Sequence, residues 1–387
     1  MYFCVVKKTL YIVSSIVIIF LLCYTFWSNY DRASATEHIF PRYVIGEVEE
    51  FGKNTGKGNI IALSPYVHTY DFSSKEAFYN MLHYYFSFAQ RRKLLNDSTI
   101  IVLPEYIGTW LVVANEKRSM YADTSLEEGM KTIVWSNFGK FGTAYLKASA
   151  KDKTKEALFK MKAEKMLDIY QTTFSKLAKE FQVTIVAGSV VLPNPSVKNG
   201  RMEIDKSGKL YNVSAVFDVN GNVHSPLSKK IFPINEELSF TGSANKNEIP
   251  VYKTAAGTLA VLICADSWYP ENYQFLKDKN CSILAVPSFV SGNNTWSKKW
   301  KGYNDAPTPA DVDRKDIDNC TEQDAWFKYA MTGRIKAADI KQGVTVFLRG
   351  DLWNLGSDGH TLLWNNGAPV ESKKSNEKTG SLINVWL

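Results

Sequence analysis

The chain has 387 residues, of which 45% are hydrophobic, 13% aromatic and 22% charged. This composition excludes a globally disordered chain, because so many aromatic side chains can bury enough surface to offset the conformational entropy lost on folding. The formal net charge of +7 comes without a long Lys/Arg run or a basic patch interleaved with aromatic residues, so nucleic acid is not an expected partner.

The cysteines and histidines give no pattern of a disulfide framework or a metal site. The five cysteines are scattered and form no CxxC pair, and the five histidines show no HExxH spacing. We therefore expect neither a redox site nor a bound metal.

Residues 9–27 form an apolar run, and no charged residue lies between Lys8 and Asp31. At about 1.5 Å per residue, this uncharged stretch reaches roughly 30 Å as a helix, which is enough to cross the hydrocarbon core of a membrane. Its far end carries aromatic residues of the kind that prefer a membrane–water interface, namely Tyr24, Phe26 and Trp27. We therefore predict a transmembrane signal anchor at residues 9–27.

The positive charges of Lys7 and Lys8 predict the orientation of this anchor. By the positive-inside rule, residues 1–8 stay in the cytoplasm and the rest of the chain lies outside, in a periplasmic or extracellular space. The sequence Ala33-Ser34-Ala35 resembles a signal-peptide cleavage site, so cleavage after Ala35 is an open alternative. The apolar run is longer than the roughly 7 to 15 residues of a signal peptide, which favours a retained, single-pass anchor.

The chain after the anchor is expected to form a linker and one domain. Residues 28–58 contain several glycines and are predicted as a linker, with a short strand at Tyr43–Ile45. Ser73 with Glu76 predicts a capping box that opens a helix. From residue 59 to 387, strands alternate with helices, which indicates a mixed sheet covered by helices. The predicted strands are 60–63, 99–103, 183–187, 210–219, 257–264, 281–287 and 344–348, and the predicted helices are 73–95, 162–181, 272–279 and 332–341.

Two stretches interrupt this alternation, at about 110–160 and 291–330. The second is polar and directly follows a strand end, and long loops of that kind often border functional sites. We expect it to line the mouth of the active site, with Trp296 and Trp300 as candidate substrate contacts. Simple packing on the surface is the alternative.

Three ionisable residues follow apolar strands, where α/β folds place their sites. Glu105 ends the sequence IIVLPE, Cys264 ends LAVLIC, and Lys229 lies in SPLSKKIFP. An acid, a thiol and an amine can act as base, nucleophile and oxyanion stabiliser, which covalent acyl transfer requires. Each residue alone is more often structural, as a cap, a core residue or a solvated lysine.

Several motifs in order resemble those of the carbon-nitrogen hydrolase (nitrilase) superfamily. The similar segments are VLPEY around Glu105, VAGSV at 186–190, LYNVSAVFDVNGNV at 210–223, KKIFP at 229–233, ICADSWYPE at 263–271 and GRIKAADIKQGVTVF at 333–347. The resemblance covers about residues 59–363. It implies a four-layer α-β-β-α sandwich and a catalytic Glu, Lys and Cys, matched here by Glu105, Lys229 and Cys264.

The match leaves two positions ambiguous and differs from the family at two others. Lys229 and Lys230 both fit the lysine motif, and the proline at 233 favours Lys229. Amide-hydrolysing members often carry a second Glu after the lysine, for which Glu237 fits better than Glu236. Common members have an aromatic residue directly after the cysteine and an arginine four positions after it, where this chain has Ala265 and Trp268.

The resemblance implies hydrolysis of a linear, non-peptide amide through a Cys264 thioester, without a cofactor. Glu105 would take the thiol proton, and Lys229 with the Ala265 backbone N–H would face the oxyanion, while Trp268 and Trp296 would contact a small-molecule amide substrate. An N-acyltransferase and a catalytically silent binding module of the same fold stay open, whereas the absence of GxSxG disfavours a serine hydrolase. The resemblance also implies a homodimer.

Overall fold

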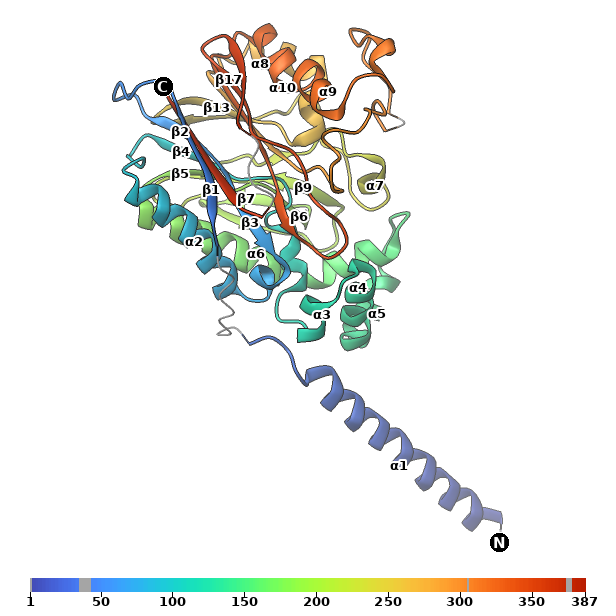
Figure 1. Ribbon diagram of the computed structural model, residues 1–387. Helices are drawn as coiled ribbons and strands as arrows, with labels where there is room; N and C mark the ends of the chain where they lie inside the picture. The colour runs from blue at the N-terminus through green and yellow to red at the C-terminus, as the bar shows by residue number, and fades with distance from the viewer. Residues whose placement is uncertain (1, 35–42, 305, 374–377) are drawn as a thin grey trace.

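The structure is a computed structural model that describes residues 2–34, 43–304, 306–373 and 378–387 (Figure 1). Helix α1 (Tyr2–Asn29) extends away from the body of the protein. Its segment Val6–Asn29 is long and apolar enough to cross a membrane, and a signal sequence near an N-terminus has the same properties. The predicted anchor at residues 9–27 lies within this segment, whereas the possible cleavage point after Ala35 lies outside the described residues.

Two six-stranded mixed sheets form the centre of the body. The first has the order β1 (Ile45–Phe51), β19 (Gly380–Trp386), β2 (Asn59–Ser64), β4 (Thr99–Val102), β5 (Thr184–Val186) and β10 (Val216–Phe217). The second has the order β12 (Val251–Thr254), β13 (Gly257–Val261), β14 (Ile283–Ser288), β15 (Gln342–Phe347), β17 (Leu362–Asn365) and β18 (Ala368–Glu371). Strands β2, β4 and β5 run parallel, as do β13, β14 and β15.

Smaller sheets and helices complete the body. The additional strands are β6 (Val190–Pro193), β9 (Leu210–Ser214) and β11 (Ser228–Lys229) in one sheet, β3 (Tyr66–His68) with β16 (Arg349–Asp351), and β7 (Ser196–Lys198) with β8 (Arg201–Glu203). The α-helices of the body are α2 (Lys75–Arg91), α3 (Arg118–Ala122), α4 (Leu126–Ser136), α5 (Phe138–Leu146), α6 (Lys153–Phe181), α7 (Asn235–Leu238), α8 (Pro270–Lys277), α9 (Glu322–Tyr329) and α10 (Met331–Arg334).

Alternation along the strands explains how the layers pack. In β2, Ile60 faces the second sheet, while Ile61 faces a core that includes residues of α2 and α6. In β13, Val261 faces the first sheet, while Ala260 packs in a core that includes residues of α8 and α10. The cores therefore place helices against the outer sides of both sheets, which agrees with the mixed sheet covered by helices that the sequence predicted.

Several boundaries differ from the predictions; for example, the helix predicted at 162–181 begins at Lys153, and the strand predicted at 257–264 ends at Val261. Residues 45–51, assigned above to a linker, form β1, which pairs in parallel with β19. The sequence IGEVEEF hides this strand because β1 is an edge strand in which Glu49 and Glu50 can reach solvent, although Glu47 is buried. The capping residue of α2 is Ser74, whose side chain accepts a hydrogen bond from the Ala77 N–H, and not Ser73.

Candidate active site

Glu105 and Cys264 both follow strands of the two central sheets. Glu105 lies just beyond β4 and is almost fully buried. Cys264 lies just beyond β13, opens the 3-10 helix η3 (Cys264–Trp268), and is 8% exposed. Its φ of 50° is in the left-handed region, which costs a non-glycine residue roughly 1–3 kcal/mol and is common at functional sites. The sharp turn holds the Cys264 thiol at the edge of the sheet. Without such a turn, a buried thiol would be an ordinary core group.

Lys230 joins the buried carboxylates of this region. Its Nζ lies 2.8 Å from Oε1 of Glu105 and 2.6 Å from Oε2 of Glu237, and all three side chains are almost fully buried. The expected Glu237 is therefore part of the cluster, whereas its rival Glu236 is exposed.

The prediction that Lys229 joins Glu105 is wrong. Lys229 is half-buried, and its Nζ lies 4.7 Å from the centre of the Tyr211 ring. Consecutive side chains of an extended segment point to opposite faces, so Lys229 at the end of β11 and Lys230 directly after it diverge. The Lys230 N–H donates to the Asn212 carbonyl at 2.8 Å, which fixes the face that Lys230 presents to Glu105.

Two further residues, Asn212 and Tyr106, connect the carboxylates, and neither was predicted from the sequence. The Asn212 amide donates to Oε1 of Glu105 at 2.9 Å and to Oε1 of Glu237 at 3.0 Å, and the Tyr106 hydroxyl donates to Glu237. The polar Asn212 lies on the buried face of β9, which is the signal that could have identified it.

Asp266 connects the lysine segment to the turn at Cys264. Its Oδ1 accepts the N–H groups of Ile231 at 2.9 Å and Phe232 at 2.7 Å, and its Oδ2 accepts the Ile263 N–H at 3.2 Å. Burial raises the pKa of Asp266 to about 7 although these N–H groups favour the charged form. Asp266 therefore fixes the spacing between Lys230 and Cys264.

The two glutamates of the cluster titrate differently. Burial, opposed by Lys230 and reinforced by the nearby charge of Glu237, raises the pKa of Glu105. Burial would also raise the pKa of Glu237, but Lys230 and the hydrogen bonds of Tyr106 and Ile234 hold it below its ordinary value. One carboxylate is thus kept as an anion, while the other is suited to exchanging a proton.

The pKa values of Cys264 and Lys230 are shifted in a way that fits the two glutamates. Burial and the adjacent charge of Glu105 raise the pKa of the Cys264 thiol well above its ordinary value. The pKa of Lys230 also lies well above its ordinary value, because Glu105 and Glu237 outweigh the effect of burial. At neutral pH the cluster therefore holds a thiol and an ammonium group, and the thiol needs a base to become a nucleophile.

A cavity of about 1110 Å³ opens onto these residues, and Glu105, Lys230, Glu237 and Cys264 all line it. Ala265 lines it beside the cysteine. This volume slightly exceeds the range of about 300–1,000 Å³ that is usual for small-molecule sites, so the cavity can enclose a substrate larger than a simple amide.

The stretch at 291–330 supplies much of the cavity wall, as the sequence predicted. Trp268 and Trp300 both line the cavity, with ring centres 5.7 Å apart. Trp296 does not belong to this wall, and its prediction as a substrate contact is corrected. The centre of its ring lies 5.1 Å from the centre of the Phe347 ring, and Trp296 lines a separate small cavity together with His360.

The described residues contain no group of three or more His, Cys, Asp or Glu side chains placed to hold a metal ion. The residues around the main cavity instead combine a thiol, two carboxylates, an ammonium group and aromatic rings. Such a set can perform nucleophilic and acid–base chemistry on an acyl group.

Curated proteins with similar sequences match only part of this chain. The Probable hydrolase YhcX of Bacillus subtilis is 26% identical over 118 residues, which are 30% of this chain and 20% of that protein. A deaminated glutathione amidase of Synechocystis sp. is 30% identical over 131 residues, which are 31% of this chain and 45% of that protein. The chain therefore spans less than half the length of these curated relatives.

Solved structures share the fold over most of the chain. A mutant of the amidase from Nesterenkonia sp. AN1, with the acetamide moiety of fluoroacetamide added covalently at its active-site cysteine, gives a TM-score of 0.51 at 11% identity, covering 91% of this chain and 93% of that chain. Another mutant of the same amidase, in complex with butyramide, gives a TM-score of 0.51 at 12% identity, covering 90% and 94%.

The Carbon-nitrogen hydrolase family matches residues 78–305, which are more than half of the chain. These residues contain the whole buried cluster of Glu105, Lys230, Glu237 and Cys264. The chain therefore belongs to the carbon-nitrogen hydrolase family.

Proposed function

We propose that this protein is a membrane-anchored, extracytoplasmic amidohydrolase that cleaves a linear C–N bond of a small-molecule amide through a thioester on Cys264. The observation that carries this proposal is the buried ion-paired cluster beside Cys264, in which Lys230 lies 2.8 Å from Glu105 and 2.6 Å from Glu237. The opposite pKa shifts of the two glutamates support separate roles for them, because a proton-exchanging carboxylate and a permanently charged one are both needed.

The first half of the reaction acylates the cysteine. Glu105 takes the Cys264 proton as the sulfur attacks the amide carbonyl, and the carbonyl oxygen gains the negative charge. Lys230 has three N–H donors, and two of them face Glu105 and Glu237, so the third can face this oxygen together with the Ala265 backbone N–H. Collapse of the intermediate breaks the C–N bond, and Glu105 gives its proton to the leaving amine.

The second half regenerates the thiol. Glu105, again ionised, removes a proton from a water molecule that attacks the thioester carbonyl. The C–S bond breaks, the sulfur recovers a proton from Glu105, and the carboxylic acid leaves. Glu237 remains an anion throughout and keeps Lys230 charged beside Glu105.

The cavity wall supports an apolar or aromatic acyl group in the substrate. Trp268 occupies the position at which common family members carry an arginine, and Trp300 and Trp326 lie beside it. These rings offer large contact area but no positive charge for an anionic group. We therefore propose that the part of the acyl group that meets these rings is uncharged, while Lys155, Lys298, Lys299 and Lys301 line other parts of the cavity.

Mass spectrometry of the intact protein tests the chemistry. A slow amide substrate should add the mass of its acyl group to Cys264, and release of the amine should precede release of the acid. Added hydroxylamine should divert the acyl group to a hydroxamate, which would distinguish a thioester from tight binding. An adduct on Cys281 or Cys320, or none at all with turnover intact, would refute the proposed mechanism.

The anchor and its orientation rest on the apolar span and on Lys7 and Lys8 at its N-terminal end. Protease added to intact cells or spheroplasts should digest the catalytic domain. Protection of the domain in intact cells, with digestion only after lysis, would contradict the topology. Recovery of a mature protein that begins after Ala35 would show cleavage in place of anchoring.

A further inference from the structure

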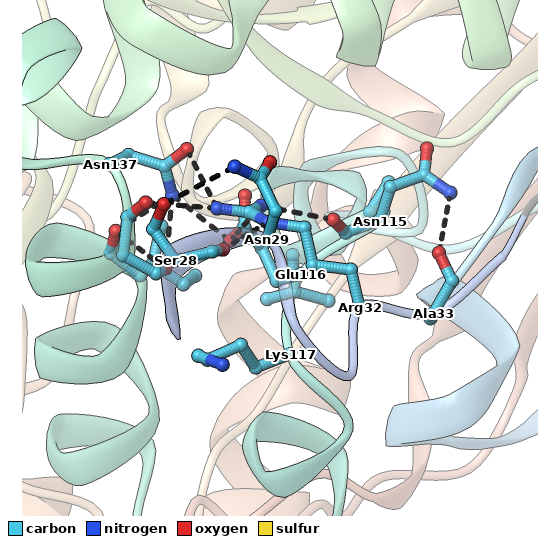
Figure 2. A network of polar contacts seen from close by, with 12 residues as sticks. Ser28, Asn29, Arg32, Ala33, Asn115, Glu116, Lys117 and Asn137 are labelled. Carbon is cyan, nitrogen blue, oxygen red and sulfur yellow. Dashed lines mark hydrogen bonds and ion pairs between the residues drawn. The ribbon is translucent and has the colours of Figure 1, made fainter. Parts of the chain in front are cut away.

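The last turn of α1 is attached to the body of the protein by a buried polar network (Figure 2). Nη1 of Arg32 lies 2.9 Å from Oε2 of Glu116, and Nη2 donates to the Ser136 carbonyl at 2.9 Å. Glu116 is almost fully buried, and its other oxygen lies 2.5 Å from Nζ of Lys162. The Ala33 N–H donates to the Glu116 carbonyl at 2.9 Å, which continues the attachment beyond Arg32.

The attachment fixes α1 against α4 and α5. The Tyr24 hydroxyl donates to the Trp135 carbonyl at 3.0 Å and accepts the Phe138 N–H at 3.1 Å. Ser28, one turn after Tyr24, is buried against the body, whereas the side chains of residues 6–22 are exposed on every face of the helix. The C-terminal end of the span and the junction of α4 with α5 therefore lie at about the same position along the axis of α1.

Apolar side chains that no described segment covers lie at this junction and at the far end of α5. We name the α4–α5 patch the residues Trp135, Phe138, Tyr145 and Leu146, which are 60%, 56%, 41% and 87% exposed. The rings of Trp135 and Phe138 stack with their planes 8° apart. All nine residues of α5 are exposed or half-exposed, which is unusual for a helix so rich in apolar residues.

The length of the span places this patch at a membrane surface. Counted from Thr9 at about 1.5 Å per residue, a hydrocarbon core of roughly 30 Å ends near Ser28. Tyr24 then lies one turn before the end of the span, and the backbone groups of Trp135 and Phe138 that hydrogen-bond to it lie close to the interfacial layer that aromatic side chains prefer. Lys140 and Lys147, both exposed on the same segment, can reach anionic headgroups.

We propose that the α4–α5 patch is inserted in the headgroup layer of an anionic bilayer, so that Arg32 and Glu116 hold the catalytic domain at one fixed orientation to the membrane. This inference rests on the membrane anchor proposed above. Figure 1 shows α3, α4 and α5 at the end of the body from which α1 extends, which is the side that faces a membrane crossed by α1. The network fixes the orientation because a domain bonded to the end of α1 cannot rotate as a domain on a flexible linker would.

Quenching of tryptophan emission tests the position of the patch. The full-length protein is reconstituted in vesicles of phosphatidylcholine and phosphatidylglycerol, with and without bromine atoms on the acyl chains near the headgroups. The Trp27→Phe and Trp135→Phe variants should each lose part of the bromine-quenched emission. Trp386→Phe is the matched control and should lose none, because the C-terminus lies at the end of the body away from α1.

The outcomes separate the patch from the anchor. A loss in Trp27→Phe without a loss in Trp135→Phe would overturn the inference and leave the span intact. No loss in either variant would contradict the anchor itself. If neither bromine nor aqueous iodide quenches Trp135, a second copy or another protein covers the patch, and the inference is wrong. Amide hydrolysis in the same vesicles reports separately on the proposed catalysis.

A pair of arginine variants tests the fixed orientation. Arg32→Ala should lower the bromine quenching of Trp135 by about half or more, whereas Arg118→Ala, which removes an exposed pair with Asp31 in the same region, should leave it unchanged. Glu116 keeps Lys162 in the Arg32→Ala variant, so the fold should survive, which a thermal melt would verify. Full quenching in Arg32→Ala would overturn the role of the network.

Discussion

Nζ of Lys230 lies 2.8 Å from Oε1 of Glu105, and both side chains are almost fully buried. This pair carries two of the proposed catalytic roles and also part of the stability of the site, because Lys230 compensates two buried carboxylates at once. Variants of the two residues must therefore be measured for stability as well as for turnover.

Lys230→Met should lower both activity and stability, and Lys229→Met should lower neither strongly. Loss of Lys230 leaves Glu105 and Glu237 unpaired in the interior, which typically costs about 3–5 kcal/mol, and it removes a proposed oxyanion donor, which typically lowers kcat by about 10²–10³-fold. Lys229 is half-buried against the Tyr211 ring, a contact worth about 0.5–1 kcal/mol. Urea unfolding and steady-state kinetics measure both effects, and equal kcat values would contradict the assignment of Lys230.

Cys264→Ser should lower kcat by roughly 10⁴-fold or more while the fold remains intact, because no other group replaces the nucleophile. Cys320→Ser is the matched control, because Cys320 is only partly buried and lies in the stretch at 291–330, outside the charged cluster. Amide turnover and the far-ultraviolet circular dichroism spectrum of each variant are the measurements. Substantial turnover by Cys264→Ser would remove the thioester from the mechanism.

The pH dependence of kcat/KM should report the raised pKa of Glu105. The base must be ionised to accept the thiol proton, so activity should rise with pH through a limb above the ordinary glutamate value of about 4.3. The charge of Glu237 helps to raise this pKa, so Glu237→Gln should move the limb to lower pH. Glu236→Gln alters an exposed residue and should leave the limb in place, and a limb that moves upward in Glu237→Gln would contradict the assignment.

Trp300→Phe should change substrate selection, and Trp296→Phe should not. Both residues are almost fully buried, so each change should cost about 1–3 kcal/mol of stability. Only Trp300 lines the main cavity, so only its replacement should alter kcat/KM between small and bulky amides, by roughly tenfold. A panel of amides with aliphatic and aromatic acyl groups provides the comparison. The same change in preference for both variants would show an indirect effect on the fold.

The sequence predicted most strands of the two sheets because their apolar runs are bounded by turn residues, and it predicted Glu105, Cys264 and Glu237 from motifs. Lys230 could not be distinguished from Lys229, since β11 has two residues and shows no visible alternation. The hydrogen bond from Asn212 to Glu105 joins positions 107 residues apart, so these two residues meet only in the folded chain. Trp296 and Trp300 are both buried aromatic residues of one segment, and only their positions separate a cavity wall from a core.

The placement of β19 limits when this site can form. Residues 380–386 pair with β1 on one side and with β2 on the other, so the sheet behind Glu105 lacks a central strand until they arrive. The ribosome synthesises residues 380–386 only after all the other strands of this sheet. We therefore expect this sheet to become complete only after these residues have been synthesised, with contacts of long sequence separation making that step slow. A chain stalled before residue 380 would leave open edges on β1 and β2, which invite aggregation.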